Sequence, residues 1–122
     1  MHYVRLFADA DGESRFEEVE LPTSALASPV SSTVFEATEP LPVKGAAFRR
    51  VVSEVPDGEP HRAPRRQFIV HLEGNVEIET SRGEKRRFTP GMVVLVEDVT
   101  GKGHVTRNLG PGMRVYLQIP LE

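Results

Sequence analysis

The amino-acid sequence predicts an all-β protein whose short strands pair mostly antiparallel. Ten glycines and ten prolines divide the 122 residues into apolar segments, and these segments have the usual strand length of about five to seven residues. No long stretch carries the helical spacing of apolar residues. Parallel neighbours would need long crossover segments, for which the chain has little room. We therefore expect a sandwich or a barrel of antiparallel strands in a single domain.

The first 45 residues are predicted to hold an N-terminal strand and an irregular arm. Residues 3–7 form the expected strand, and Asp11 and Gly12 form a turn after it. A second strand or an extended arm is indicated by three spaced apolar residues, Phe16, Val19 and Leu21. Residues 22–45 contain four prolines and many small side chains, so we expect an irregular segment that wraps the domain or reaches a partner subunit.

Residues 46–119 are predicted to form the strand-rich body of the domain. The expected strands are residues 48–55, 67–73, 76–80, 92–96, 104–108 and 113–119. The alternation is clear at 76–80, where two glutamates are interleaved with Val, Ile and Thr, as in a strand with one face in solvent. Residues 57–60 are expected to turn, and the basic run 85–87 is assigned to a solvated turn. Gly74 and Gly91 are expected to adopt positive φ at turns.

The composition argues against several classes of function. The net charge of −3 gives no basic face for nucleic acid. The absence of cysteine excludes disulfides and thiolate metal ligands. Charged and polar residues follow Met1, and no apolar run approaches the length of a membrane span. We therefore expect a cytoplasmic protein that contacts neither nucleic acid nor a membrane.

The stretch from His61 to Gly74 resembles the first conserved motif of the cupin family. In words, that motif is Gly, five residues, His, any residue, His, three or four residues, Glu, six residues, Gly. In this sequence His61 keeps the first histidine, Ala63 stands for the second and Gln67 stands for the glutamate. Six residues then separate Gln67 from Gly74, so the spacing of the motif is kept.

The stretch from Gly91 to Asn108 resembles the second cupin motif, which is Gly, five residues, Pro, any residue, Gly, two residues, His, three residues, Asn. Glu97 replaces the proline and two extra residues precede Gly101, but His104 and Asn108 keep their places. The chain is thus similar to the small single-domain cupins. The resemblance implies a double-stranded β-helix, or jelly-roll barrel, in one domain over residues 1–122, with an arm at 1–45 and the conserved barrel at 46–119.

The resemblance also implies a metal site formed by His61, Gln67 and His104. Imidazole nitrogens and a side-chain oxygen suit a divalent ion such as Zn, Ni, Fe, Mn or Cu. The replacements at Ala63 and Gln67 remove one imidazole and one negative charge from the usual ligand set. The alternative is that the three side chains are polar pocket walls satisfied by water or by a ligand.

Four further residues are predicted to line the same pocket: Arg65, Ile69, His71 and Glu97. The first three share the side-chain parity of Gln67 and should face the interior. His71 lies roughly 13 Å along the strand from Gln67, too far to bind the same ion. Arg65 suits a substrate carboxylate, with a solvated arginine as the alternative. Glu97 and its neighbour Asp98 suit a general base at the mouth of the site, or a structural cap for the loop before His104.

Two functions of different classes follow from this site. The first is a metal-dependent isomerase, lyase or cyclase that acts on a small carbonyl or carboxylate compound, with the metal polarising the carbonyl. The second is a binding module that holds a small ligand without turnover. Exposed sheet edges also predict a homodimer, in which residues 3–7 or 22–45 pack on or exchange with the second subunit.

Overall fold

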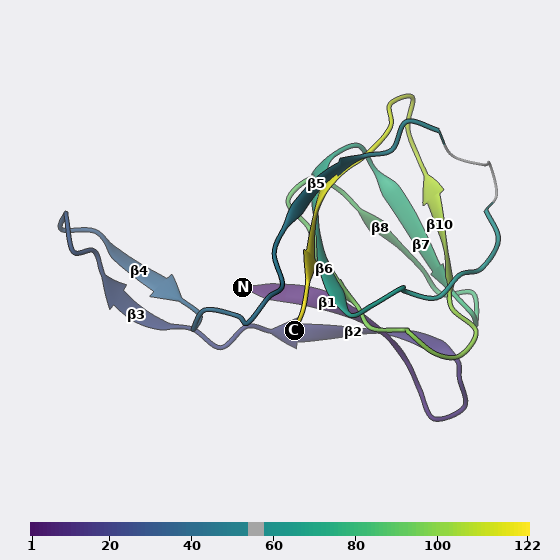
Figure 1. Cartoon of the computed structure of the whole chain (residues 1–122), viewed down its shortest axis with the longest axis horizontal. Coiled ribbons are helices and arrows are strands. Elements are labelled where there is room, and N and C mark those ends of the chain that lie inside the picture. The colour runs from purple at the N-terminus through teal and green to yellow at the C-terminus, as the bar shows by residue number, and fades with distance from the viewer. Residues whose placement is uncertain (54–57) are drawn as a thin grey trace.

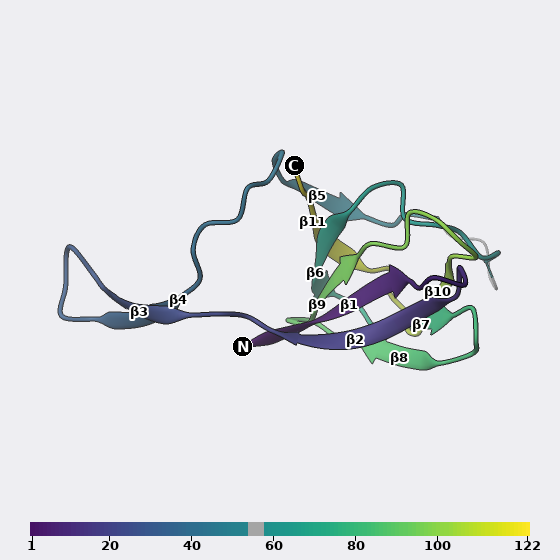
Figure 2. The ribbon, with the colours of Figure 1, turned by 90° about the horizontal axis from the view of Figure 1, so that it is seen from below.

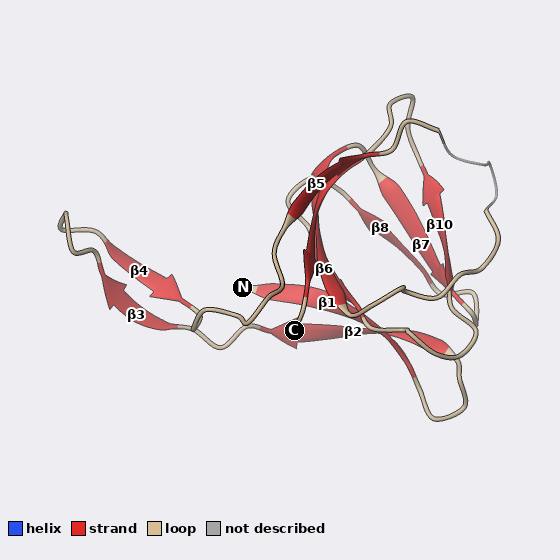
Figure 3. Ribbon diagram, in the orientation of Figure 1, coloured by secondary structure: helices blue, strands red, loops and turns tan. Residues whose placement is uncertain are grey.

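The computed structural model describes residues 1–53 and 58–122, which form strands joined by turns and loops (Figure 3). Eleven strands lie within these residues. No helix among them is long and apolar enough to cross a membrane. The strands belong to sheets of six, three and two strands.

The six-stranded sheet has the order β2-β1-β9-β6-β11-β5. Its neighbouring strands run antiparallel except for β1 and β9, which are parallel. The sheet therefore brings the N-terminal strand against strands from the second half of the chain. Its members are β1 (His2–Ala8), β2 (Ser14–Glu20), β5 (Ala47–Arg50), β6 (Gln67–Glu73), β9 (Val93–Val96) and β11 (Val115–Pro120).

The three-stranded sheet has the order β10-β7-β8 and lies across the interior from the larger sheet (Figures 1 and 2). It comprises β7 (Val76–Thr80), β8 (Lys85–Phe88) and β10 (His104–Asn108), all antiparallel. The core lies between the two sheets because each strand turns its alternate apolar side chains inward. Buried residues of this core include Leu6 and Val94 from one sheet and Val76, Ile78 and Phe88 from the other.

The remaining sheet is a hairpin of β3 (Ser24–Ala27) and β4 (Val34–Ala37). Two perpendicular views show it projecting away from the body of the molecule (Figures 1 and 2). The prediction of an irregular segment at 22–45 is therefore wrong for these eight residues. Small residues and prolines flank the two short strands and hid them in the sequence.

Most of the other predicted strands are confirmed. The strands predicted at 67–73, 76–80 and 104–108 have the observed bounds, and those at 92–96 and 113–119 are shorter or displaced by one or two residues. The basic run 85–87 is not a turn but most of β8, because its backbone pairs with β7 while its side chains alternate toward solvent. The strand predicted at 48–55 ends at Arg50. Its last two residues and the first of the 57–60 turn lie outside the described residues.

The two glycines expected at positive φ are confirmed. Gly74 has φ 78° and Gly91 has φ 94°. At Gly74 a Cβ atom would lie 3.0 Å from the Cα of Arg114, so the missing side chain also lets the backbone of the loop before β11 approach.

The fold is thus all-β and mostly antiparallel, as predicted. The described strands form separate hydrogen-bonded sheets rather than one closed barrel. The six- and three-stranded sheets leave an interior between them, and the candidate site lies there.

Candidate functional site

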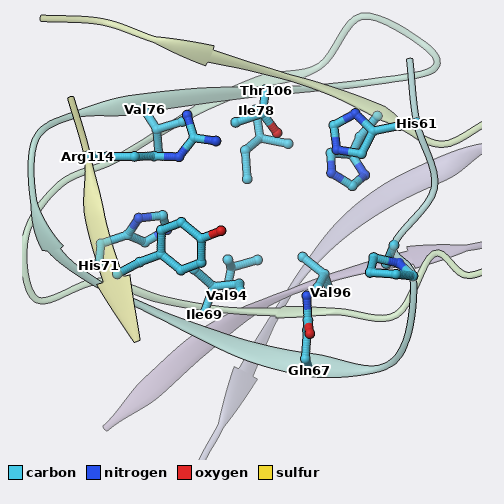
Figure 4. A pocket seen from close by; sticks show the side chains of 14 residues that line it. His61, Gln67, Ile69, His71, Val76, Ile78, Val94, Val96, Thr106 and Arg114 are labelled. Atoms are coloured by element: carbon cyan, nitrogen blue, oxygen red, sulfur yellow. The ribbon is translucent and has the colours of Figure 1, made fainter. Parts of the chain in front are cut away.

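A cavity of about 130 Å³ lies between the two sheets. A cavity of similar size holds a ring of roughly six non-hydrogen atoms. Its walls are apolar along the middle and polar at both ends. Figure 4 shows His61 at one end and His71 with Arg114 at the other.

Strand alternation along β6 places three side chains on the floor of this cavity. Gln67, Ile69 and His71 all line it, whereas Phe68 and Val70 lie on the opposite face of the sheet. The parity argument is therefore confirmed for the three residues within β6. It also separates Gln67 from His71, which lie toward opposite ends of the cavity (Figure 4).

His61 and His104 meet at one end of the cavity. Their backbones form an isolated antiparallel bridge, in which each N–H donates to the other's carbonyl oxygen at 2.9 Å. The bridge fixes the two side chains on one side, with ring centroids 4.6 Å apart. His104 is buried and His61 is exposed, so the pair connects the interior with the mouth.

A buried carboxylate holds the inner histidine of this pair. The side chain of Asp98 is fully buried, and its Oδ2 lies 2.5 Å from Nδ1 of His104. A carboxylate in this position accepts the Nδ1 proton and leaves Nε2 as the basic nitrogen of a side chain that lines the cavity. Asp98 is therefore placed to orient the ring of His104 and to stabilise a positive charge on it, rather than to cap the loop at the surface.

Gln67 is engaged by a second buried amide. Nε2 of Gln118 on β11 donates to Oε1 of Gln67 over 2.5 Å. The Gln67 amide nitrogen then remains to donate to a ligand in the cavity. This end of the site thus offers two imidazoles and one amide donor.

The far end of the cavity combines a buried histidine with a cation. Arg114 and Tyr116 line it together with His71, and the ring of His71 stacks on Phe88 with centroids 5.4 Å apart. Neither ring nitrogen of His71 has a protein hydrogen-bond partner among the described residues. Burial, and secondly the positive charge of Arg114, lower the pKa of His71 to about 4. His71 is therefore a neutral group at neutral pH, and its ring forms part of the cavity wall.

The neutral, buried state of His71 predicts a loss of stability in acid. In the unfolded chain the imidazole takes up its proton near pH 6.5, whereas in the folded protein it does so only near pH 4. Between these values the unfolded state binds more protons, so the free energy of unfolding falls by up to about 1.4 kcal/mol per pH unit as the pH decreases. Urea unfolding of the wild type and of His71→Phe at pH 7 and pH 4.5 measures this effect. The His71→Phe variant should lose less stability in acid than the wild type. The control variant His2→Gln, at an exposed position, should lose as much stability as the wild type. An identical acid response in His71→Phe would contradict the assignment.

Two of the predicted pocket residues lie outside the cavity. Arg65 is exposed. β6 begins only at Gln67, so the alternation of its side chains does not extend back to Arg65. Glu97 turns away from the cavity to the surface, where its oxygens bind Arg5 at 2.6 Å and Arg66 at 2.5 Å. A substrate clamp at Arg65 and a general base at Glu97 therefore have no place in this cavity.

The three side chains predicted to hold a metal, His61, Gln67 and His104, all line this cavity. Among residues 1–53 and 58–122, no group of three or more His, Cys, Asp or Glu side chains is placed to hold a metal ion. The carboxylate of Asp98 holds Nδ1 of His104, an arrangement that general-base and metal-ligating histidines share. The side-chain oxygen of Gln67 accepts from Gln118 and keeps a second lone pair. A divalent metal therefore stays a prediction of the sequence.

Sequence reasoning missed the contribution of β11. Arg114 precedes this strand, and Tyr116 and Gln118 alternate along it with Val115, Leu117 and Ile119. Polar residues in such a pattern ordinarily face solvent. Here they face the interior, because the apolar set faces the outer side of the sheet. One signal in the sequence could have shown this. Phe68 and Val70 on the neighbouring strand β6 are apolar at positions that face outward, which indicates that the outer face of this sheet is covered.

Comparison with known proteins gives no relative from which to transfer a function. No protein-family model matches the chain, and no curated protein matches it.

Proposed function

We propose that this protein is a cupin-type enzyme that moves a proton on a small carbonyl carboxylate, as an isomerase or a lyase. The cupin assignment is supported by the spacing of His61, Gln67, Gly74 and His104, and by two facing, mostly antiparallel sheets around a small cavity. The reaction class is inferred from the side chains of that cavity, since a fold alone does not define a reaction.

The observation that carries the proposal is the buried Asp98–His104 pair. A neutral imidazole whose Nδ1–H is held by a carboxylate is a general base at Nε2, and the same carboxylate stabilises the imidazolium after proton transfer. The pair is fully enclosed on its Asp98 side and opens to the cavity on its His104 side.

The substrate class is inferred from the other end of the cavity. Arg114 makes contacts within the chain, and its positive charge reaches this end of the cavity, where it contributes to lowering the pKa of His71. A positive end of a cavity favours an anionic group such as a carboxylate. The volume of about 130 Å³ limits the enclosed part of the ligand to a few carbon atoms. Small 2-oxo acids meet these requirements.

The proposed reaction transfers one proton in two steps. Nε2 of His104 removes a proton from the carbon beside the carbonyl, and the electron pair moves onto the carbonyl oxygen as an enolate. The amide N–H of Gln67 donates to the developing negative charge. The proton then returns to a different atom, which completes an isomerisation. In a lyase reaction the electron pair instead expels a leaving group, which takes the proton that Nε2 of His104 removed.

The binding module remains the second candidate, and one observation favours it. Ala63 stands where the cupin motif has a second histidine, and Gln67 stands in place of its glutamate, so the site has fewer strong metal ligands than the motif supplies. Such a cavity holds a small acid equally well without turning it over. The two functions differ in whether the bound ligand exchanges a proton.

Proton exchange with solvent separates the two functions. The protein is treated with EDTA and incubated in D2O with pyruvate or 2-oxobutyrate, and deuterium entry beside the carbonyl is followed by proton NMR. We expect exchange at a rate proportional to protein concentration. Saturation transfer to the ligand without exchange would support the binding module. Exchange that requires added Zn, Ni, Fe, Mn or Cu would refute the metal-free mechanism, and neither binding nor exchange would refute the substrate class.

A further inference from the structure

The outer face of the six-stranded sheet is an apolar groove. Side chains of β1, β6, β9 and β11 form its floor and the segment leading away from the hairpin forms one wall, around a space of about 420 Å³. Its apolar floor and wall residues include Tyr3, Leu41, Phe68, Val70, Val93 and Ile119. A groove of this kind on a soluble protein indicates that another surface covers it.

The apolar face continues beyond the groove to the edge of the sheet. Phe48 on β5 pairs with Leu117, and Leu117 pairs with Val70, so the three side chains lie on the same outer face. Phe48 is 79% exposed. Arg50, two residues further along β5, is an exposed cation, and Lys44 in the segment before β5 is another. The face to be covered is thus apolar with a positive margin.

The projecting hairpin β3–β4 has the complementary surface. Leu26 and Phe35 are cross-strand partners on one hairpin face, and they are 57% and 49% exposed. The only charged residues between Leu21 and Val43 are Glu36 and Glu39. A two-stranded hairpin with uncovered apolar side chains is marginal alone and needs a surface to pack on. The hairpin is therefore an apolar arm with a negative margin.

The arm and the groove meet at the root of the hairpin. Leu21 and Thr38, which flank the hairpin, both line the groove. From there β3 and β4 run outward and carry Leu26 and Phe35 away from the chain's own groove (Figures 1 and 2). A second copy related by a two-fold axis near the root brings its own arm over this groove and receives this arm in return. One symmetric contact then covers both apolar surfaces and places each acidic margin beside a basic one.

We propose that the occupant of the groove is the β3–β4 hairpin of a second copy of this chain. The resulting homodimer exchanges arms, with the Leu26–Phe35 face seated over Phe68 and Val70 of the other subunit. The contact lies on the side of the sheet opposite the cavity, so each subunit keeps its own site and the proposal is independent of the reaction.

Sedimentation of the full chain at micromolar concentration tests the assembly. We expect twice the chain mass of 13.6 kDa. The double variant Leu26→Asp, Phe35→Asp should raise the dimer dissociation constant by about 100-fold or more, since it places charges in the apolar centre of the contact. Both side chains are exposed within one chain, so far-UV circular dichroism should not change. A matched variant on the other hairpin face, Val34→Asp, should leave the dimer intact.

A spin label identifies which surfaces touch. The chain has no cysteine, so a nitroxide on Ser28→Cys is the only label, and a labelled copy is mixed with an unlabelled ¹⁵N copy. We expect broadened amide signals around Val70 in the unlabelled copy. A monomeric wild type, a double variant that remains dimeric, or unbroadened signals around Val70 would each overturn the proposal.

Discussion

Replacing Asp98 with asparagine is expected to lower the rate of proton exchange in the cavity by about 100-fold or more. The carboxylate of Asp98 lies 2.5 Å from Nδ1 of His104 and has no contact with solvent. An amide in its place neither carries the charge that stabilises the imidazolium nor fixes the tautomer with a basic Nε2. The rate should fall while the ligand dissociation constant changes little, because Arg114 and His71 at the other end are unaltered.

Two readouts distinguish this positioning role from a loss of structure. In the wild type, the ¹⁵N chemical shifts of His104 should show a protonated Nδ1 and an unprotonated Nε2. In Asp98→Asn they should show a change of tautomer. The neighbouring Glu97→Gln is the matched control, because its carboxylate binds Arg5 and Arg66 outside the cavity. It should leave the exchange rate within about twofold of the wild type. Equal losses in the two variants would contradict a specific role for Asp98.

Strand parity explains how much of the site was predictable from the sequence. Alternation from Gln67 placed Ile69 and His71 inside, and the motif spacing brought His61 next to His104. The same parity did not carry back to Arg65, because alternation holds only within a strand and β6 begins at Gln67. A local pattern therefore predicts local side-chain direction, and it stops being informative where the backbone leaves the strand.

The remaining members of the site depend on contacts between distant segments. Asp98 and Glu97 are adjacent carboxylates with no difference in local pattern, yet one is buried against His104 and the other binds surface arginines. Their fates are decided by what the loop before β10 packs against. Arg114 is likewise placed by the approach of its backbone to Gly74, forty residues earlier in the chain. Neither contact has a signature in composition or spacing.

The fold shows the same division between local and distant information. The strands at 67–73 and 104–108 were predicted to the residue because turn residues delimit them. The hairpin β3–β4 was missed because its strands are only four residues long and β3 consists mostly of Ala and Ser, so no period is visible. Short strands of this kind form through pairing with each other rather than through intrinsic preference.

Replacing Gly103 with alanine is expected to lower the free energy of unfolding by about 3 kcal/mol or more. Gly103 has φ 75°, and a Cβ atom there would overlap the carbonyl oxygen of His61. That carbonyl accepts the N–H of His104, and Ser14 Oγ donates to the carbonyl of Gly103 at 2.7 Å. Relief of the overlap must therefore move the backbone bridge that sets the two imidazoles 4.6 Å apart.

Gly91→Ala is the matched control for this substitution. Its φ of 94° carries a similar conformational penalty, but nothing lies within 4 Å of the added Cβ. The control should cost only about 1–2 kcal/mol, as measured by urea unfolding at pH 7. The excess cost in Gly103→Ala then reports the close approach at His61, and it should be accompanied by shifted imidazole signals of His61 and His104. Equal costs in the two variants, with unshifted histidine signals, would show that the bridge does not depend on the missing side chain at Gly103.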